Sequence, residues 1–186
     1  MIWDSNSWKR QLAADARYLE RAMRDTTWSE DRFTALERRI FVSAYAIRKL
    51  MDSQKLSDEL EGQPIRCKAY IATGMPVDVM NWDRIDQLYD FEKAVPSELS
   101  LREYCNQVVH SFVFMLRTTR RSALRGFFVA SERVRKGKLY DLNIKDVIAL
   151  IRATSDDDVI SMTSKRDPTD GVMRIVSKSN RELPRP

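Results

Sequence analysis

The sequence predicts an α+β protein, in which N-terminal antiparallel helices and a central buried helix pack with a small, mostly antiparallel C-terminal β-sheet. Three observations predict this class. Apolar residues recur at helical spacing before Gly62, and a capping-box pattern opens a further helix at Ser100. After Gly126, short apolar segments alternate with turn residues, as is typical of hairpins.

Two helices are predicted before Gly62. The first covers residues 5–24 and carries an apolar stripe made of Trp8, Leu12, Ala16, Leu19 and Met23. The second begins at the capping pattern Thr27-x-x-Glu30 and runs to about Glu61, where Gly62 stops it. The short link between the two helices implies that they pack antiparallel.

The middle of the chain is predicted to form a strand, a short helix and a linker. Ile65–Thr73 alternates apolar and polar residues, which is typical of a half-buried strand. Asn81–Phe91 carries apolar residues at helical spacing and is expected to be a short helix. Ala94–Leu99, which contains Pro96, is predicted to be a linker into the next helix.

The central helix is predicted over Ser100–Arg117, because Ser100 and Glu103 have the spacing of a capping box. Most of its apolar residues fall in one arc of the helical wheel. Val113 and Phe114 fall on the other side, among polar residues. This distribution indicates a helix that is buried on more than one side.

The only histidine of the chain, His110, lies on this predicted helix. Arg102, Asn106 and His110 follow one another at i, i+4 and i+8 as a partly buried polar stripe. Buried polar groups need partners, so one interpretation is a core histidine that is hydrogen-bonded to Asn106 or to a neighbouring helix. The other is a catalytic site, in which His110 acts as general acid or base and Arg102 or Asn106 holds a phosphate or the imidazole.

The rest of the chain is predicted to form β-hairpins with one helix between them. The predicted strands are Gly126–Ser131, Leu139–Leu142, Val159–Lys165 and Val172–Lys178. Asn143 is predicted to cap a helix that runs to about Ala153. Because residues 65–73 can join these hairpins, we expect one domain over residues 1–186, made of a helical hairpin (1–62), a strand with the central helix (63–123), β-hairpins with one helix (124–179) and a frayed tail (180–186).

Composition excludes several classes of site. With one histidine and two cysteines, Cys67 and Cys105, that lack C-x-x-C spacing, we expect no metal, no cofactor and reduced thiols. The run Asp156–Asp158 is predicted to be a solvated turn, because successive residues of an extended loop do not converge on an ion. The chain has no G-x-S-x-G elbow and no Gly-rich phosphate loop. It also has no signal-like N-terminus and no apolar run of about 18 residues, so we expect a cytoplasmic protein without a membrane span.

A strongly basic segment follows the central helix. Eight cations stand against one acid, Glu132, giving a local net charge of +7 in a chain whose net charge is +5; they are Arg117, Arg120, Arg121, Arg125, Arg133, Arg135, Lys136 and Lys138. Clustered cations attract phosphates, and at most one of the adjacent Phe127 and Phe128 can face a base. We therefore predict contact with RNA or DNA here. The alternative is a solvated hairpin tip whose edge strand is guarded by charge.

The segment Cys105-Asn106-Gln107-Val108-Val109-His110 resembles the motif of the HEPN superfamily, in which an Arg, usually followed by a polar residue, is separated from a His by four to six intervening residues. Cys105 stands at the Arg position here, and Arg102 precedes His110 by seven intervening residues. HEPN proteins are helical and often dimeric. Many are metal-independent ribonucleases of prokaryotic toxin and defence systems, and others only bind. The resemblance implies a dimer with His110 at its catalytic centre, whereas the strand-rich part after Gly126 lies outside that fold.

Two classes of function are compatible with these observations. The first is a nucleic-acid-engaging, RNA-cleaving protein of HEPN-like type, with His110, Arg102 and Asn106 as catalytic residues. The second is a non-enzymatic protein-interaction or oligomeric assembly module in which His110 is structural. The polar distal half of the predicted helix 28–61 favours the second class, as do tryptophans near the N-terminus that are candidates for exposure. All four tryptophans are expected to be core or interface anchors and not ligand cages; they are Trp3, Trp8, Trp28 and Trp82.

Overall fold

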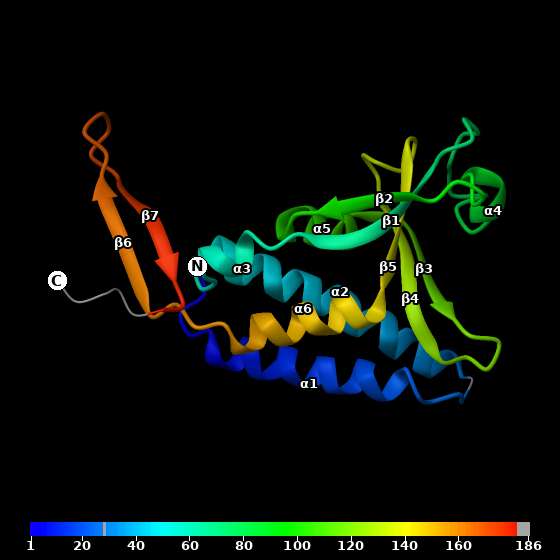
Figure 1. The fold of residues 1–186 in the computed structure, drawn as a ribbon, viewed down its shortest axis with the longest axis horizontal. Coiled ribbons are helices and arrows are strands. Elements are labelled where there is room, and N and C mark those ends of the chain that lie inside the picture. The colour runs from blue at the N-terminus through cyan, green and yellow to red at the C-terminus, as the bar shows by residue number, and fades with distance from the viewer. Residues whose placement is uncertain (28, 182–186) are drawn as a thin grey trace.

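A computed structural model of the chain describes residues 1–27 and 29–181, and the predicted α+β class is confirmed (Figure 1). Helices and strands follow one another in the order α1 (Asn6–Ala22), α2 (Glu30–Asp52), α3 (Asp58–Glu61), β1 (Ile65–Ile71), α4 (Ile85–Leu88), β2 (Val95–Leu99), α5 (Leu101–Val109), β3 (Ser111–Thr118), β4 (Leu124–Ser131), β5 (Lys138–Asn143), α6 (Ile144–Asp156), β6 (Ser161–Arg166) and β7 (Met173–Ser179).

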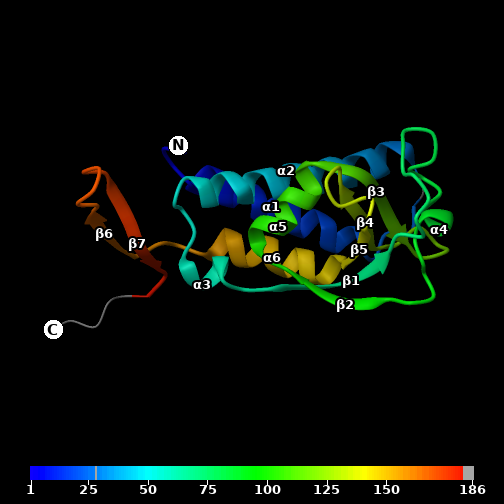
Figure 2. The ribbon, with the colours of Figure 1, turned by 90° about the horizontal axis from the view of Figure 1, so that it is seen from above.

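The main sheet has five strands in the order β2-β1-β5-β4-β3, and each neighbouring pair is antiparallel. Ile65–Ile71 does join the later strands, because β1 pairs with β5. The last two strands, β6 and β7, form a separate antiparallel hairpin, which we call the C-terminal arm. Figures 1 and 2 show the main sheet at one end of the helical layer and the C-terminal arm at the other.

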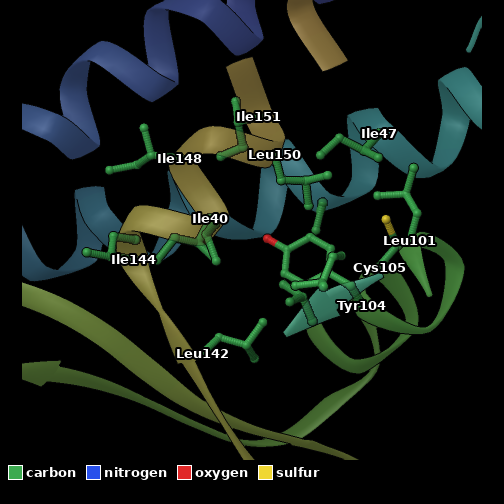
Figure 3. Close-up of a cluster of buried hydrophobic side chains, with 14 of the residues drawn as sticks. Ile40, Ile47, Leu101, Tyr104, Cys105, Leu142, Ile144, Ile148, Leu150 and Ile151 are labelled. Carbon is green, nitrogen blue, oxygen red and sulfur yellow. The ribbon is translucent and has the colours of Figure 1, made fainter. Parts of the chain in front are cut away.

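The main core lies between the helices and one face of this sheet. Its fully buried side chains come from α1, α2, α5 and α6 and from the helix-facing positions of the strands. Tyr104 of α5 lies at its centre, surrounded by side chains such as Ile40, Leu142 and Ile151 (Figure 3). A smaller core covers part of the other face, where Val77, Leu88 and Tyr89 from the segment after β1 pack on the strands.

The prediction of one helix over Ser100–Arg117 is wrong after Val109, where the chain changes to strand β3. Side chains of β3 alternate between the two faces of the sheet. Val113 packs in the smaller core, and Phe114 packs against the main core. These are the two residues that did not fit the apolar arc of a helix, so their mismatch reflected the twofold period of a strand.

Four boundaries before α5 also differ from the predictions. The predicted helix 28–61 ends at Asp52, because the chain turns through a left-handed Gln54 (φ 58°), and a short α3 follows. Its cap is Ser29, whose side chain accepts from Arg32 N at 3.1 Å, and not Thr27. The predicted helix 81–91 shrinks to α4. The predicted linker contains β2, an edge strand, which is where a sheet tolerates a proline.

The predictions after β3 agree closely with the structure. The strands β4 to β7 and the helix α6 form where they were expected, and Asn143 caps α6 by accepting from Lys145 N at 2.9 Å. Of the tryptophans, Trp3 is exposed, Trp8 packs against the main core and Trp82 is 39% exposed. Trp28 and residues 182–186 of the predicted tail lie outside the described residues. Among the helices that the structure describes, none is long and apolar enough to cross a membrane.

The acidic run Asp156–Asp158 is not a simple solvated turn. Asp157 is buried and accepts from Ser57 N at 2.7 Å, Ser57 Oγ at 2.6 Å and Asn180 Nδ2 at 3.1 Å. The buried Lys9 donates to the carbonyl of Asp157 and, at 2.7 Å, to Asp158 Oδ1. These contacts join α1, the start of α3 and the base of the C-terminal arm. The prediction missed them because Lys9 and Ser57 lie 100 or more residues away in sequence, and Asn180 lies 23 residues away beyond the hairpin.

Candidate functional site: the His110 pocket

His110 stands at the junction between α5 and β3. The capping box at the start of α5 is present in full: Ser100 Oγ accepts from Glu103 N at 3.2 Å, and Glu103 Oε2 accepts from Ser100 N at 2.8 Å. Nine residues later His110 is the C-cap, with its N–H bonded to the carbonyl of Asn106. Its side chain is exposed. The interpretation of His110 as a core histidine therefore does not fit its position.

The exposed imidazole lines a pocket of about 700 Å³ between α5 and the end of β4. Its lining residues are Glu103, Asn106, Gln107 and His110 from the helix, and Ser131, Glu132, Arg133 and Val134 from β4 and the following turn. Two hydrogen bonds hold these walls together. Ser131 N donates to Gln107 Oε1 at 2.9 Å, and Glu132 N donates to the carbonyl of His110 at 3.1 Å. The pocket is thus a fixed feature of the packing between helix and sheet.

Asn106 lines this pocket beside His110, but Arg102 does not. Arg102 Nη1 donates to Asp52 Oδ1 at 3.0 Å, and Arg48 Nε donates to the same carboxylate at 3.1 Å. Burial raises the pKa of Asp52, but hydrogen bonds from Arg102 and Arg48 outweigh it, so this pKa is lowered overall. Arg48 also donates to Asn106 Oδ1. Of the three predicted catalytic residues, the structure brings together two, and it links Arg102 to them only through Asp52 and Arg48.

Cys105, at the Arg position of the HEPN-like motif, is fully buried. Burial raises the pKa of its thiol to about 12. It faces the main core and is absent from the pocket lining. Cys67 is half-buried, and burial raises its pKa to about 11. Both thiols are free, and neither has the thiolate character of a nucleophile or a metal ligand.

The basic segment does not form one patch. Arg120 and Arg121 lie in the turn before β4, whereas Arg133, Lys136 and Lys138 lie in and beside the turn after it. These two groups stand at opposite ends of an eight-residue strand, which spans about 24 Å. All five are exposed, and no ion pair involves them among the described residues. Only Arg133 lines the His110 pocket.

The other three cations of the segment have partners inside the protein. Arg117 Nε donates to Asp141 Oδ1 at 3.0 Å, and Arg125 Nη1 donates to the carbonyl of Met23 at 3.0 Å. Arg135 donates to the carbonyl of Val77 and pairs with Glu132 at 2.7 Å. The guanidinium groups of these three residues are therefore engaged by acceptors within the protein.

The two aromatic residues predicted as alternatives for base stacking pack within the protein. Phe127 is fully buried, 5.2 Å from Phe114 between ring centroids. Phe128 is half-buried on the opposite face of β4, against Phe91 at 5.5 Å and Tyr70 at 6.2 Å. No group of three or more potential metal-ligating side chains occurs within residues 1–27 and 29–181.

Apart from Arg133, sequence reasoning missed the β4 side of the pocket. Glu103 and Gln107 could have been found, because they lie seven and three residues before His110 and share its helix face. Ser131, Glu132 and Val134 approach His110 only because β4 pairs back along β3.

No protein-family model matches the chain, and neither a curated protein nor a solved structure matches it.

Proposed function

We propose that the chain binds RNA at the His110 pocket and that His110 transfers the proton in cleavage of the bound strand. The observation that carries this proposal is the exposure of the only imidazole in a pocket of about 700 Å³ beside an unpaired arginine, Arg133. Lys136 in the same turn and Lys138 at the start of β5 are two further exposed cations that follow Arg133 in the chain. A phosphate held there gains charge-assisted contacts that an uncharged ligand lacks.

The chemistry requires a base beside a 2′-hydroxyl. The imidazole of His110 takes the 2′-hydroxyl proton, the 2′-oxygen attacks the adjacent phosphorus, and the bond to the 5′-oxygen breaks to leave a cyclic phosphate. The leaving 5′-oxygen must gain a proton. Because the chain has one histidine, that proton returns from the same imidazole or comes from His110 of a second copy. Arg133 offsets the charge of the attacked phosphate.

The HEPN resemblance remains a prediction beside this proposal. In its favour, Asn106 and His110 share the pocket at the end of one helix. The arginine of that motif has no counterpart at Cys105, which is buried. Arg133, which approaches from the β4 side, supplies a cation instead, so we propose it in place of Arg102 as the residue that holds phosphate.

Binding and cleavage are tested separately with a labelled single-stranded RNA. We expect binding that weakens steeply with added salt. Arg133→Ala should weaken it by about tenfold, a loss of one charge-assisted contact. Lys145→Ala is the matched control, because Lys145 is an exposed cation at the opposite end of β5. Equal affinities for the two variants, or affinity that does not respond to salt, would remove the proposed binding site.

For cleavage, His110→Ala should bind RNA like the wild type but leave it intact. Substituting a 2′-deoxynucleotide at the scissile position should also block cleavage, because the nucleophile is then missing. Because His110 is exposed, the variant should unfold at the same urea concentration as the wild type. Cleavage that survives either change argues against a catalytic role for His110.

A second candidate function is oligomeric assembly, and the C-terminal arm favours it. The arm and its flanking residues expose six large apolar side chains, Ile160, Met162, Val172, Met173, Ile175 and Val176. A two-stranded hairpin is marginally stable by itself, and a concentration of exposed apolar side chains is typical of contact surfaces. Light scattering on the wild type and on a Met162→Ser, Ile175→Ser double variant tests this function. Assembly would be favoured over the first proposal if the wild type forms an oligomer and binds no RNA, and if the double variant is monomeric.

A further inference from the structure

A second, smaller pocket lies between α2, the start of β3 and the segment that precedes α4. Its volume is about 240 Å³, and its lining residues are Glu37, Phe41, Trp82, Ser111, Phe112 and Phe114. Four of these six residues are aromatic, and one is an acid. The three elements that build this pocket can be followed in Figure 1.

The aromatic walls are held in place by packing. Glu37 and Phe41 lie one turn apart on α2, so they share one helix face. The ring of Phe41 lies 4.7 Å from that of Phe114, and Phe114 in turn lies 5.2 Å from the buried Phe127. Trp82 is 39% exposed and lines the pocket from the segment that precedes α4. Phe41 and Phe114 therefore have little conformational freedom to lose on binding, whereas the ring of Phe112 already carries Arg135 over one face.

The acid at this pocket has no partner among the described residues. Glu37 is absent from their ion pairs and from their side-chain hydrogen bonds, whereas many other acidic residues form ion pairs. Glu37 is exposed, and the partial desolvation of its carboxyl raises its pKa. The nearby cation Arg135 lies over Phe112, 3.7 Å from the ring centroid, and its charge is paired with Glu132. The pocket thus holds an excess negative charge.

We propose that this pocket binds a compact organic cation of the alkylammonium class. The faces of aromatic rings are electronegative and attract an ammonium group, and the carboxylate of Glu37 supplies the counter-charge. An apolar ligand would leave that carboxylate without compensation, and a phosphate would be repelled by it. The volume is below that of pockets for drug-sized ligands, which suits a free head group of the choline type. This inference is independent of the function proposed for His110.

The test compares two probes of one shape. Choline and 3,3-dimethyl-1-butanol differ chiefly in the positive charge of the head group, so a purely apolar pocket would favour the neutral analogue, which has no charge to desolvate. The readout is the indole N–H signal of Trp82 in the nitrogen–proton spectrum of the full chain, which is assigned by its loss in Trp82→Phe. We expect choline to shift this signal and to bind about tenfold more tightly than the neutral analogue.

Glu37→Gln should weaken choline binding about tenfold and leave the neutral analogue unaffected. Glu92→Gln is the matched control, because Glu92 is an exposed acid outside the pocket, and it should change neither affinity. Equal affinity for the two probes, an unchanged affinity of Glu37→Gln for choline, or no shift with choline would each overturn the proposal. A trimethyl-lysine peptide that binds more than about tenfold tighter than choline would overturn the assignment to a free ligand.

Discussion

Arg117 on β3 donates from Nε to Asp141 Oδ1 on β5 at 3.0 Å, although a third strand, β4, separates the two. The arginine crosses that strand at Gly126, which is its register partner. A Cβ at position 126 would meet Arg117 Nη2 at 2.8 Å and the carbonyl oxygen of Leu142 at 2.1 Å. The missing side chain of Gly126 therefore makes room for an ion pair that joins the first and third strands of this part of the sheet.

Gly126→Ala should lower the free energy of unfolding by about 3 kcal/mol, because strand β5 must move away from β4 to admit the methyl group. Urea unfolding measures this change. Gly137→Ala is the control, since its Cβ would meet only the Val134 carbonyl oxygen, at an ordinary 3.8 Å, and should change stability by less than about 1 kcal/mol. Similar losses for the two variants would contradict the close contact at Gly126.

Ser100→Ala should reduce stability by about 1 kcal/mol, because it removes the side-chain half of the α5 capping box. Thermal or urea unfolding provides the measurement. Ser5 precedes α1 in the same way but makes no side-chain capping bond, so Ser5→Ala should be close to neutral. If Ser5→Ala costs as much as Ser100→Ala, helix capping is not the source of the effect.

Glu103→Gln should give a pH-dependent loss of stability. Hydrogen bonds from Ser100, first of all from its backbone N–H, lower the pKa of Glu103 below its unfolded value. The stabilisation by the charged form is therefore complete above the unfolded pKa, roughly 4.3, and is lost as the pH falls through the lower folded pKa. The variant should be less stable than the wild type by about 0.5 kcal/mol at pH 7, and the difference should shrink below about pH 4. Unfolding curves at several pH values measure this difference, and a difference that stays constant down to low pH would exclude this origin.

Native protein should react slowly with a thiol reagent at pH 8. The pKa values of about 11 for Cys67 and about 12 for Cys105 leave little thiolate, and Cys105 is also inaccessible. In denaturant both thiols should react promptly, and Cys67→Ser and Cys105→Ser assign the two phases. A fast phase in the native protein, or fewer than two reactive thiols after unfolding, would be inconsistent with two free cysteines of which Cys67 is half-buried and Cys105 is buried.

Asp157→Ala should cost about 3 kcal/mol, because it leaves Ser57 N and Oγ buried without their acceptor. Asp156→Ala, one residue earlier and exposed, should change stability by no more than about 0.5 kcal/mol. Hydrogen exchange should show faster opening of β7 than of β4 in the first variant, since Asp157 anchors the C-terminal arm. Equal exchange in the two strands would mean that the arm is held by other contacts, such as those of Lys178 with Asp58 and Glu61.

The fold could be predicted where one local signal dominated. The capping box at Ser100 and the cap at Asn143 marked the starts of α5 and α6 correctly, because a cap depends on residues three or fewer positions apart. The end of α5 could not be predicted in the same way. The apolar run after His110 fits a helix and a strand alike, and its pairing with β4 decides between them.

The candidate site was predictable in part for a similar reason. His110 and Asn106 share a helix face, and the sequence placed them together. Arg102 was grouped with them by spacing, but it binds Asp52, 50 residues earlier. The basic segment was treated as one surface, but its middle forms the extended strand β4, which separates the cations at its two ends. Spacing within a helix is visible in a sequence, but contacts between distant elements are not.

The passage from α5 into β3 leaves a single residue, His110, between the helix and the strand. One added residue there would either rotate the helix by about 100° or turn every side chain of β3 to the opposite face. Deleting one residue would have the same effect in reverse. Position 110 should therefore accept exchange of its side chain far more readily than any change in chain length, and insertions should be found in the turns at the two ends of β4 instead.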